Sequence, residues 1–193
     1  VNSKIIFIST SAVFDGSKES NLENHEPKPI NYHGLTHFQA EKIIRESGLS
    51  NLILRTDHPY GWVEKWQKEN TAVRVINRLE YNESVSEVID WYNTPTFIDN
   101  FIDVSLKLVE RQKEGIYHVV GPDFVNRYMF ALKIAELMKK DRNLIKPVKS
   151  SELKLPAKRA KVKLNNKKSE IDAKMVLVGI EDGIKQMLKQ RNS

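Results

Sequence analysis

The sequence predicts an α/β fold built on a parallel β-sheet. Residues 4–10 and 51–56 are apolar along both faces, as strands in the middle of a parallel sheet are. Between them, residues 32–46 repeat apolar side chains at helical spacing. The order strand, helix, strand is that of a βαβ unit, so we expect the two strands to pair in parallel.

The composition indicates a soluble globular protein. The chain has 193 residues, 40% of them hydrophobic and 29% charged, which suffices for one domain or for one domain and a small lobe. No apolar run approaches the roughly 20 residues that span a bilayer. The absence of cysteine excludes disulfides, thiolate chemistry and zinc–thiolate sites. We therefore expect a cytoplasmic protein with no membrane partner.

The later elements follow from periodicity and capping residues. Asn126 is a good N-cap for the helix that follows it. The predicted helices after the first βαβ unit are 65–79, 98–112, 127–140 and 181–190, and residues 85–89 are a predicted strand. None of the eight glycines forms the G-x-G-x-x-G pattern that holds a dinucleotide phosphate.

Several short motifs carry a more specific signal. They are S-T-S-A-V-F-D-G at 9–16, P-I-N-Y-H-G-L-T-H-F-Q-A-E at 29–41, L-R-T at 54–56, T-P-T at 94–96, G-I-Y-H-V-V-G at 115–121 and L-P-A-K-R-A at 155–160. In this order they resemble the extended short-chain dehydrogenases/reductases, and most closely the dTDP-4-dehydrorhamnose reductases. The resemblance covers almost the whole chain.

This resemblance implies the C-terminal part of a Rossmann-type doubly wound parallel sheet with a small α/β substrate-binding lobe. Residues 1–62 would belong to the dinucleotide-binding domain, and 63–193 mainly to the lobe, with 85–112 as a segment that can return to the sheet. The family's phosphate-binding part precedes the strand that opens this chain. We therefore expect a partial chain that lacks roughly 90 residues, at about 30 per βαβ unit. The implied cofactor is NADP or NAD.

The same alignment assigns the site. Matching Gly34 to the family glycine places His33 at the catalytic tyrosine position and His37 at the lysine position. The resemblance further implies that Thr10 is a catalytic residue that bonds the substrate carbonyl. It implies cofactor contacts by Ser9, Arg55 and Thr56, and substrate contacts by Asp57, His58, Thr94 and Arg159.

The two histidines keep the family spacing but change its chemistry. His33 could still donate a proton near neutral pH. His37, neutral above about pH 6.5, would supply no permanent positive charge. Three alternatives stay open: altered chemistry, drift in a site that has lost its catalytic role, and a metal pair with His58 as third ligand. We predict no metal, because no H-E-x-x-H motif is present.

Residues 146–168 form a basic segment in a chain with a net charge of +6. By resemblance it would contact a nucleotide diphosphate through Arg159. A nucleic-acid patch and an ordinary solvated face are the other interpretations. The segment has no interleaved aromatic side chains on which bases could stack. The nucleic-acid patch is therefore the weakest of the three interpretations.

The leading functional hypothesis, from the resemblance, is an NAD(P)-dependent nucleotide-sugar reductase of dTDP-rhamnose biosynthesis, with reduction impaired by His33 and His37. The alternative is a non-catalytic, regulatory member of the same fold that binds a nucleotide or a partner. The expected partners are a nucleotide-sugar or nucleotide diphosphate, and either a second copy or an N-terminal partner chain.

Overall fold

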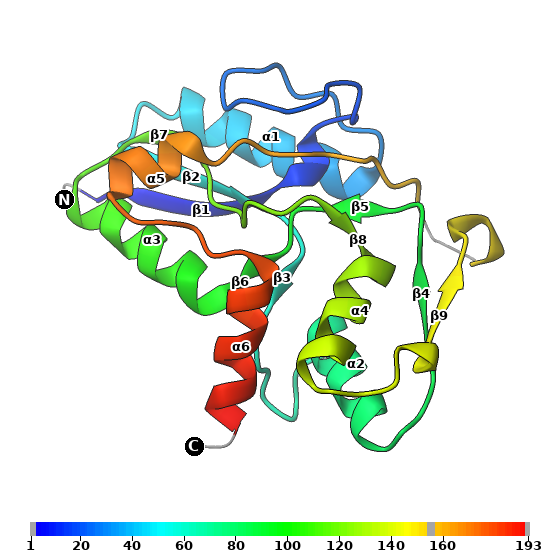
Figure 1. The fold of residues 1–193 in the computed structure, drawn as a ribbon. Coiled ribbons are helices and arrows are strands. Elements are labelled where there is room, and N and C mark those ends of the chain that lie inside the picture. Colours follow the sequence, from blue (N-terminus) through cyan, green and yellow to red (C-terminus); the bar gives the residue numbers. More distant parts are fainter. Residues whose placement is uncertain (1–2, 154–156, 192–193) are drawn as a thin grey trace.

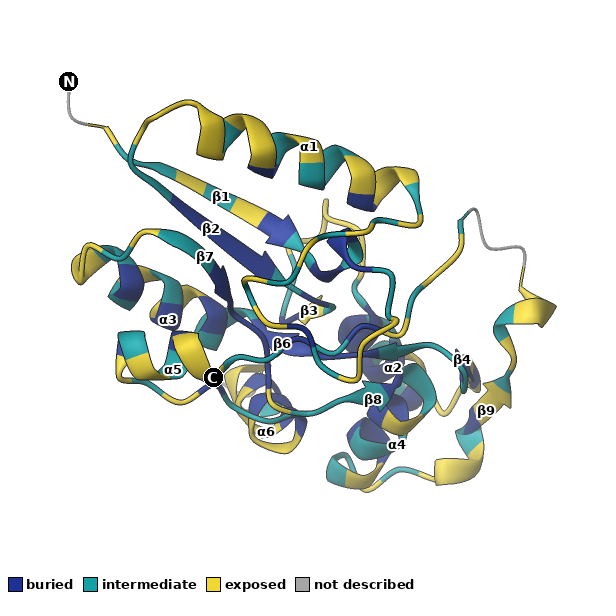
Figure 2. Cartoon of the chain, turned by 90° about the horizontal axis from the view of Figure 1, so that it is seen from above, coloured by how far each residue is buried: buried dark blue, intermediate teal, exposed yellow. Residues whose placement is uncertain are grey.

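The computed structural model describes residues 3–153 and 157–191. Its centre is a parallel sheet in the order β1-β2-β7, formed by β1 (Ile5–Thr10), β2 (Asn51–Thr56) and β7 (Gly115–His118). Helix α1 (Tyr32–Glu46) covers one face, and α3 (Ile98–Glu110) and α5 (Lys167–Ala173) cover the other (Figures 1 and 2). The predicted α/β class and the parallel pairing of the first two strands are confirmed.

Strand β1 has a neighbour on one side among the described residues. It pairs only with β2 and lies at the edge of this three-stranded sheet. Ile6 and Ile8 are consequently 49% and 54% exposed, whereas Leu52 and Leu54 in β2 are buried. The expectation of a central strand depends on the N-terminal part that the resemblance implies, and it stays a prediction.

Helix α1 begins close to the end of β1. The Asn31 side chain caps it by accepting a hydrogen bond from the Gly34 N–H at 2.9 Å. A Cβ on Gly34 would lie 2.0 Å from the carbonyl oxygen of Ala12, so only glycine allows this approach. Ala12 belongs to η1 (Ser11–Val13), the turn that follows β1. The first turn of α1 is thus held against the carboxyl end of the sheet.

The remaining chain pairs short strands around a second core. The parallel pairs are β3 (Pro59–Tyr60) with β6 (Thr96–Phe97) and β4 (Val85–Val88) with β9 (Ile145–Val148); β5 (Tyr92–Asn93) and β8 (Val125–Asn126) are antiparallel. The helices are α2 (Thr71–Glu80), α4 (Arg127–Leu137) and α6 (Ile180–Arg191), with 3₁₀ turns η2 (Arg142–Leu144) and η3 (Ser150–Glu152). Their shared core includes Tyr60, Ile76, Phe97, Phe130 and Ile184.

Two element predictions need correction. The helix expected over 65–79 begins only at Thr71, because the Asn70 side chain caps it through the Val73 N–H at 3.2 Å. Trp66, taken as part of its apolar side, is 82% exposed. Helix α5 was missed because the lysines at its start were read as part of a basic segment.

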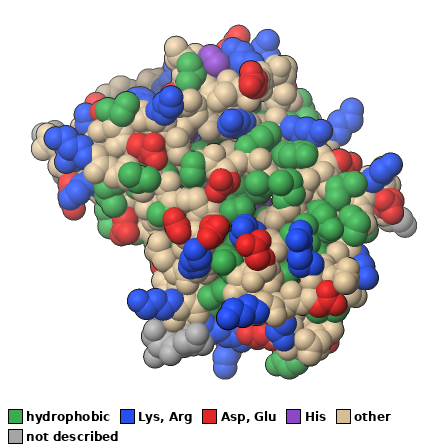
Figure 3. Space-filling model, viewed as in Figure 1, with side chains coloured by type: hydrophobic (Ala, Val, Ile, Leu, Met, Phe, Trp, Pro, Cys, Tyr) green, Lys and Arg blue, Asp and Glu red, His purple; other side chains and the backbone are tan. Residues whose placement is uncertain are grey.

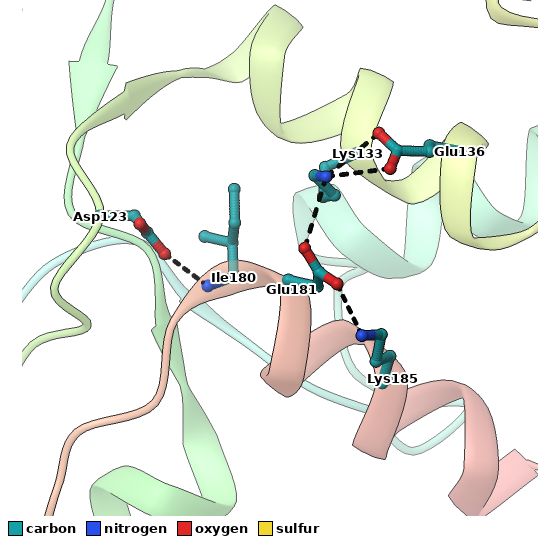
Figure 4. Close-up of polar contacts among 6 residues, drawn as sticks. All are labelled: Asp123, Lys133, Glu136, Ile180, Glu181 and Lys185. Atoms are coloured by element: carbon teal, nitrogen blue, oxygen red, sulfur yellow. Dashed lines mark hydrogen bonds and ion pairs between the residues drawn. The ribbon is translucent and has the colours of Figure 1, made fainter.

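An ion pair joins α6 to α4, and a half-buried aspartate binds the first residue of α6 (Figure 4). Lys133 of α4 contacts Glu181 at 3.6 Å, and Glu181 also pairs with Lys185 at 2.6 Å. The Ile180 N–H donates to Asp123 at 2.7 Å, which fixes the start of α6. These contacts position the C-terminal helix beneath the short strands.

The surface carries both signs of charge. On the face seen in Figure 3, basic and acidic side chains are interspersed among apolar ones. Within residues 3–153 and 157–191, no helix has the length and apolar character needed to cross a membrane.

Candidate active-site cleft

A cleft of about 360 Å³ opens at the carboxyl ends of β1 and β2, where ligands lie in open α/β sheets. Most of the residues predicted for the site line it together. These are Ser9, Thr10, His33, His37, Thr56, Asp57, His58 and Arg159. Arg55 and Thr94 are not among the lining residues. The geometry thus assembles in one place residues that the sequence separates widely.

Thr10 ends β1 and faces the cleft. Its Oγ1 accepts a hydrogen bond from the Ala12 N–H at 3.2 Å, which caps η1. The hydroxyl proton is not used by this bond, so the same side chain can still donate to a ligand. The structure therefore gives Thr10 a capping role and leaves it able to bind.

His33 and His37 lie one turn apart on α1 with ring centroids 4.6 Å apart. The Nδ1 atom of His37 is buried and has no hydrogen-bond partner among the described residues. Burial, and to a lesser extent His33, lower the pKa of His37, while Glu41 opposes the shift. His37 is therefore neutral at pH 7 and supplies no cation beside His33.

Asp57 is a buried carboxylate with four donors. It accepts hydrogen bonds from Ser11 Oγ at 2.9 Å, Asn93 Nδ2 at 3.3 Å, and the N–H and Oγ1 of Thr94 at 2.7 and 3.1 Å. Burial raises the pKa of Asp57, and the four bonds counter that shift. Asp57 ties the end of β2 to η1 and to β5, and Thr94 acts by holding Asp57.

Arg55 and Ser9 both bond Glu41 on α1, although Ser9 also lines the cleft. Arg55 Nε and Nη2 bond the two Glu41 carboxylate oxygens at 2.9 and 2.6 Å, and Ser9 Oγ donates to Glu41 at 2.5 Å. The Arg55 and Glu41 side chains are 1% and 0% exposed. Both predicted cofactor contacts are engaged with Glu41, whereas the buried hydroxyl of Thr56 has no partner in the described part of the chain.

His58 occupies a constrained backbone position at the cleft wall. Its φ of 43° lies in the left-handed region, which is uncommon outside glycine. Its ring contacts Phe130 edge-on at 5.9 Å, and burial lowers its pKa to about 3, with Arg127 and Arg74 contributing. His58 is therefore neutral, and its buried Nε2 has no partner within the described ranges.

Sequence reasoning missed two residues of the cleft, Trp91 and Arg127. The Arg127 and Arg159 guanidinium carbons lie 4.0 and 4.7 Å from the Trp91 ring centroid. Asn126 caps α4 and so places Arg127 in its first turn, but only the pairing of β5 with β8 brings that turn to Trp91. No single stretch of sequence carries this contact.

The arrangement gives no support to a metal site. In residues 3–153 and 157–191, no three or more His, Cys, Asp or Glu side chains are grouped so that they could hold a metal ion. His33, His37 and His58 thus share one cleft without forming a ligand set. The first two residues of the L-P-A-K-R-A motif, Leu155 and Pro156, lie outside the described residues.

Comparison with known proteins agrees with this fold. The chain is 26% identical to methionine adenosyltransferase 2 subunit beta of Rattus norvegicus over 153 residues, 76% of this chain and 46% of that protein. It is 28% identical to dTDP-4-dehydrorhamnose reductase of Aggregatibacter actinomycetemcomitans over 141 residues, 69% and 46% of the two chains. The chain thus spans about half the length of the curated relatives it matches.

Among solved structures, dTDP-4-dehydrorhamnose reductase from Bacillus anthracis, in complex with NADP, superposes with a TM-score of 0.88 at 26% identity. The superposition covers 97% of this chain and 66% of that one, which confirms the Rossmann-like α/β architecture. The model of one family, described as "RmlD substrate binding domain", matches residues 1–193. The chain belongs to the RmlD substrate binding domain family.

Proposed function

We propose that this chain binds a nucleotide-diphosphate sugar in the cleft and does not support ketone reduction at the rate of an ordinary reductase. The observation that carries the proposal is that His33 and His37 line the same cleft as Thr10. The family resemblance aligns these two histidines with the catalytic tyrosine and lysine. The proposal takes the substrate class from the relatives' names, dTDP-4-dehydrorhamnose reductase among them.

The electrostatics favour binding over catalysis. General acid catalysis by a tyrosine needs a nearby cation to lower its pKa, and neutral His37 cannot provide one. Arg159, by contrast, carries a permanent charge into the cleft and can bond a diphosphate bidentately. The described residues thus retain an anion contact but not the proton-transfer pair.

Two of the three implied NADP or NAD contacts, Ser9 and Arg55, are bonded to Glu41. The proposal therefore concerns the substrate side of the cleft, and we derive no hydride-transfer step.

Calorimetric titration of the full chain with dTDP and dTDP-sugars tests the binding. Arg159→Ala should weaken binding by about 1.5–3 kcal/mol, the value of a hydrogen bond to a charged group. Lys149→Ala is the matched control, because Lys149 is exposed and lies outside the cleft. Absence of binding at millimolar ligand, or equal losses in the two variants, would refute the proposal.

An assay with dTDP-4-dehydrorhamnose and NADPH, with any missing N-terminal half supplied, tests the loss of catalysis. We expect a rate well below the ordinary range of about 1–10³ per second. The double variant His33→Tyr/His37→Lys restores the tyrosine–lysine pair and should raise any residual activity if the remaining site is intact. Turnover at an ordinary rate by the unsubstituted chain would contradict the claim.

A second candidate is a non-catalytic subunit that binds a protein partner. The identity of 26% to methionine adenosyltransferase 2 subunit beta favours it, since that name describes one subunit of an enzyme. The test is whether the chain changes the kinetics of a methionine adenosyltransferase catalytic subunit in a titration. Unchanged kinetics, together with no comigration in size-exclusion chromatography, would count against this role.

A further inference from the structure

Arg127 lies between two cavities. It lines the cleft, and it also lines an adjoining cavity of about 400 Å³, together with His58 and Pro59, which are shared by both. The adjoining cavity adds two further cations, Lys68 and Arg74, and one carboxylate, Glu69, which accepts a hydrogen bond from Asn77. In Figure 1 the start of α4, which carries Arg127, lies beside β8 and close to β5.

The Arg127 charge has no direct carboxylate partner. Within the described ranges neither Arg127 nor Arg159 forms an ion pair, and the buried Arg127 Nε makes no hydrogen bond. Glu87, in β4, raises the pKa of Arg127, but its carboxylate is paired with Arg74 of α2. Asp57 is saturated by four donors.

A half-buried guanidinium in this setting is electrostatically unfavourable. Burial lowers the pKa of Arg127, and the neighbouring Arg74 and Arg159 act in the same direction. The Trp91 ring offsets part of this cost, because a cation is attracted to an aromatic face. An anion bound beside Arg127 in the adjoining cavity would offset the remaining electrostatic cost of burying the guanidinium.

We propose that Arg127, with Lys68 and His58, forms a second anion subsite that selects a nucleotide-linked sugar bearing its own negative group. This inference rests on the proposed function, in which Arg159 contacts the diphosphate. A neutral sugar would leave the Arg127 guanidinium without an anionic partner. A carboxylate or phosphate on the sugar would accept two parallel hydrogen bonds from it. His58 Nε2 can add a hydrogen bond if the neutral ring carries its proton there.

The test compares dTDP-glucuronic acid with dTDP-glucose by calorimetric titration of the full chain. We expect the anionic sugar to bind about 10- to 100-fold more tightly, the scale of one charge-assisted contact. Arg127→Met should abolish that preference, so that the two sugars bind this variant with equal affinity. Methionine keeps an unbranched side chain over Trp91, and Lys149→Met, an equal loss of charge outside both cavities, is the control.

Titration of dTDP-glucose with inorganic phosphate present identifies the source of the second anion. Phosphate that tightens dTDP-glucose binding in the unsubstituted chain, but not in Arg127→Met, supports the subsite with a free anion as its occupant. Equal affinity for the two sugars without any phosphate effect overturns the subsite while the proposed function stands. If neither sugar binds, both the subsite and the proposed function fail.

Discussion

Glu41 and Arg55 form a buried ion pair that joins α1 to β2, with both side chains almost fully enclosed. Glu41→Gln would leave the Arg55 guanidinium buried without a counter-charge. We expect this change to lower the free energy of unfolding by about 3–5 kcal/mol, measured by urea denaturation. Lys42→Ala is the control from the same helix, because the Lys42–Glu46 pair is 65% exposed on each side and is worth about 1 kcal/mol or less. Equal losses would show that the buried pair has no special role.

Two buried histidines, His118 and His58, make the free energy of unfolding depend on pH. Burial lowers the pKa of His118 to about 3, and that of His58 to about 3. Because these values lie below about 6.5, the unfolded value, the unfolded chain binds more protons in the window between them. The free energy of unfolding should therefore fall as pH is lowered from 6.5, by up to about 1.4 kcal/mol per pH unit for each histidine.

His118→Gln removes one of these titrations. Between pH 4 and pH 6, the free energy of unfolding of this variant should depend less steeply on pH than that of the unsubstituted chain. The difference in slope should correspond to about one proton. Between pH 7 and pH 8 the two curves should run parallel, which separates the titration from any uniform loss of packing. Parallel curves over the whole range would contradict the assignment of His118 as a buried neutral group.

At the residue scale, the sequence could predict those cleft residues that stand in motifs. Thr10, His33 and His37 were expected together and do line one cleft. Trp91 and Arg127 could not be predicted, because their contact depends on the pairing of β5 with β8, two strands of two residues each. Strands this short carry no periodicity.

At the scale of elements, α6 depends on a glycine in its interior. A Cβ on Gly183 would lie 2.1 Å from the Tyr60 hydroxyl and 3.0 Å from the Phe97 Cβ. Gly183→Ala should therefore destabilise the chain by about 1–3 kcal/mol through overpacking, although alanine favours a helix by about 1 kcal/mol. Gln186→Ala, at an exposed position of α6, should change stability little. Thermal unfolding of both variants checks this, and a stabilised Gly183→Ala chain would contradict the packing.

Element types were more predictable than element ends. The helices over 98–110 and 127–137 follow from strong apolar periodicity and were expected within three residues of their observed bounds. The start of α2 was misplaced because Asn70 competes with the apolar side chains upstream, and its capping bond decides the boundary. Helix α5 has seven residues and depends on packing against α3 and β7, which the sequence pattern does not report.

At the scale of the whole molecule, the two largest hydrophobic cores lie in different layers. One lies between the sheet and α3, around Leu52, Val104 and Tyr117, and the other lies among α2, α4 and α6. Asp57 joins the end of β2 to η1 and to β5 through its bonds to Ser11, Asn93 and Thr94. The sequence could predict the first core from its strands. The second is built largely from side chains of α2, α4 and α6. Its arrangement needed the structure, and the division into domains stays a prediction.

The free edge of β1 predicts self-association of the 193-residue chain. An edge strand presents unpaired N–H and C=O groups, and here Ile6 and Ile8 add exposed apolar surface beside them. We expect the sedimentation coefficient to rise with protein concentration. Ile6→Lys should reduce that rise, because a lysine on an edge strand disfavours strand pairing. Leu106→Lys is the control: Leu106 is 56% exposed on α3, away from any strand edge, and should leave self-association unchanged. Equal relief by both variants would assign the association to exposed apolar area in general, and a coefficient independent of concentration would show that the β1 edge does not pair under these conditions.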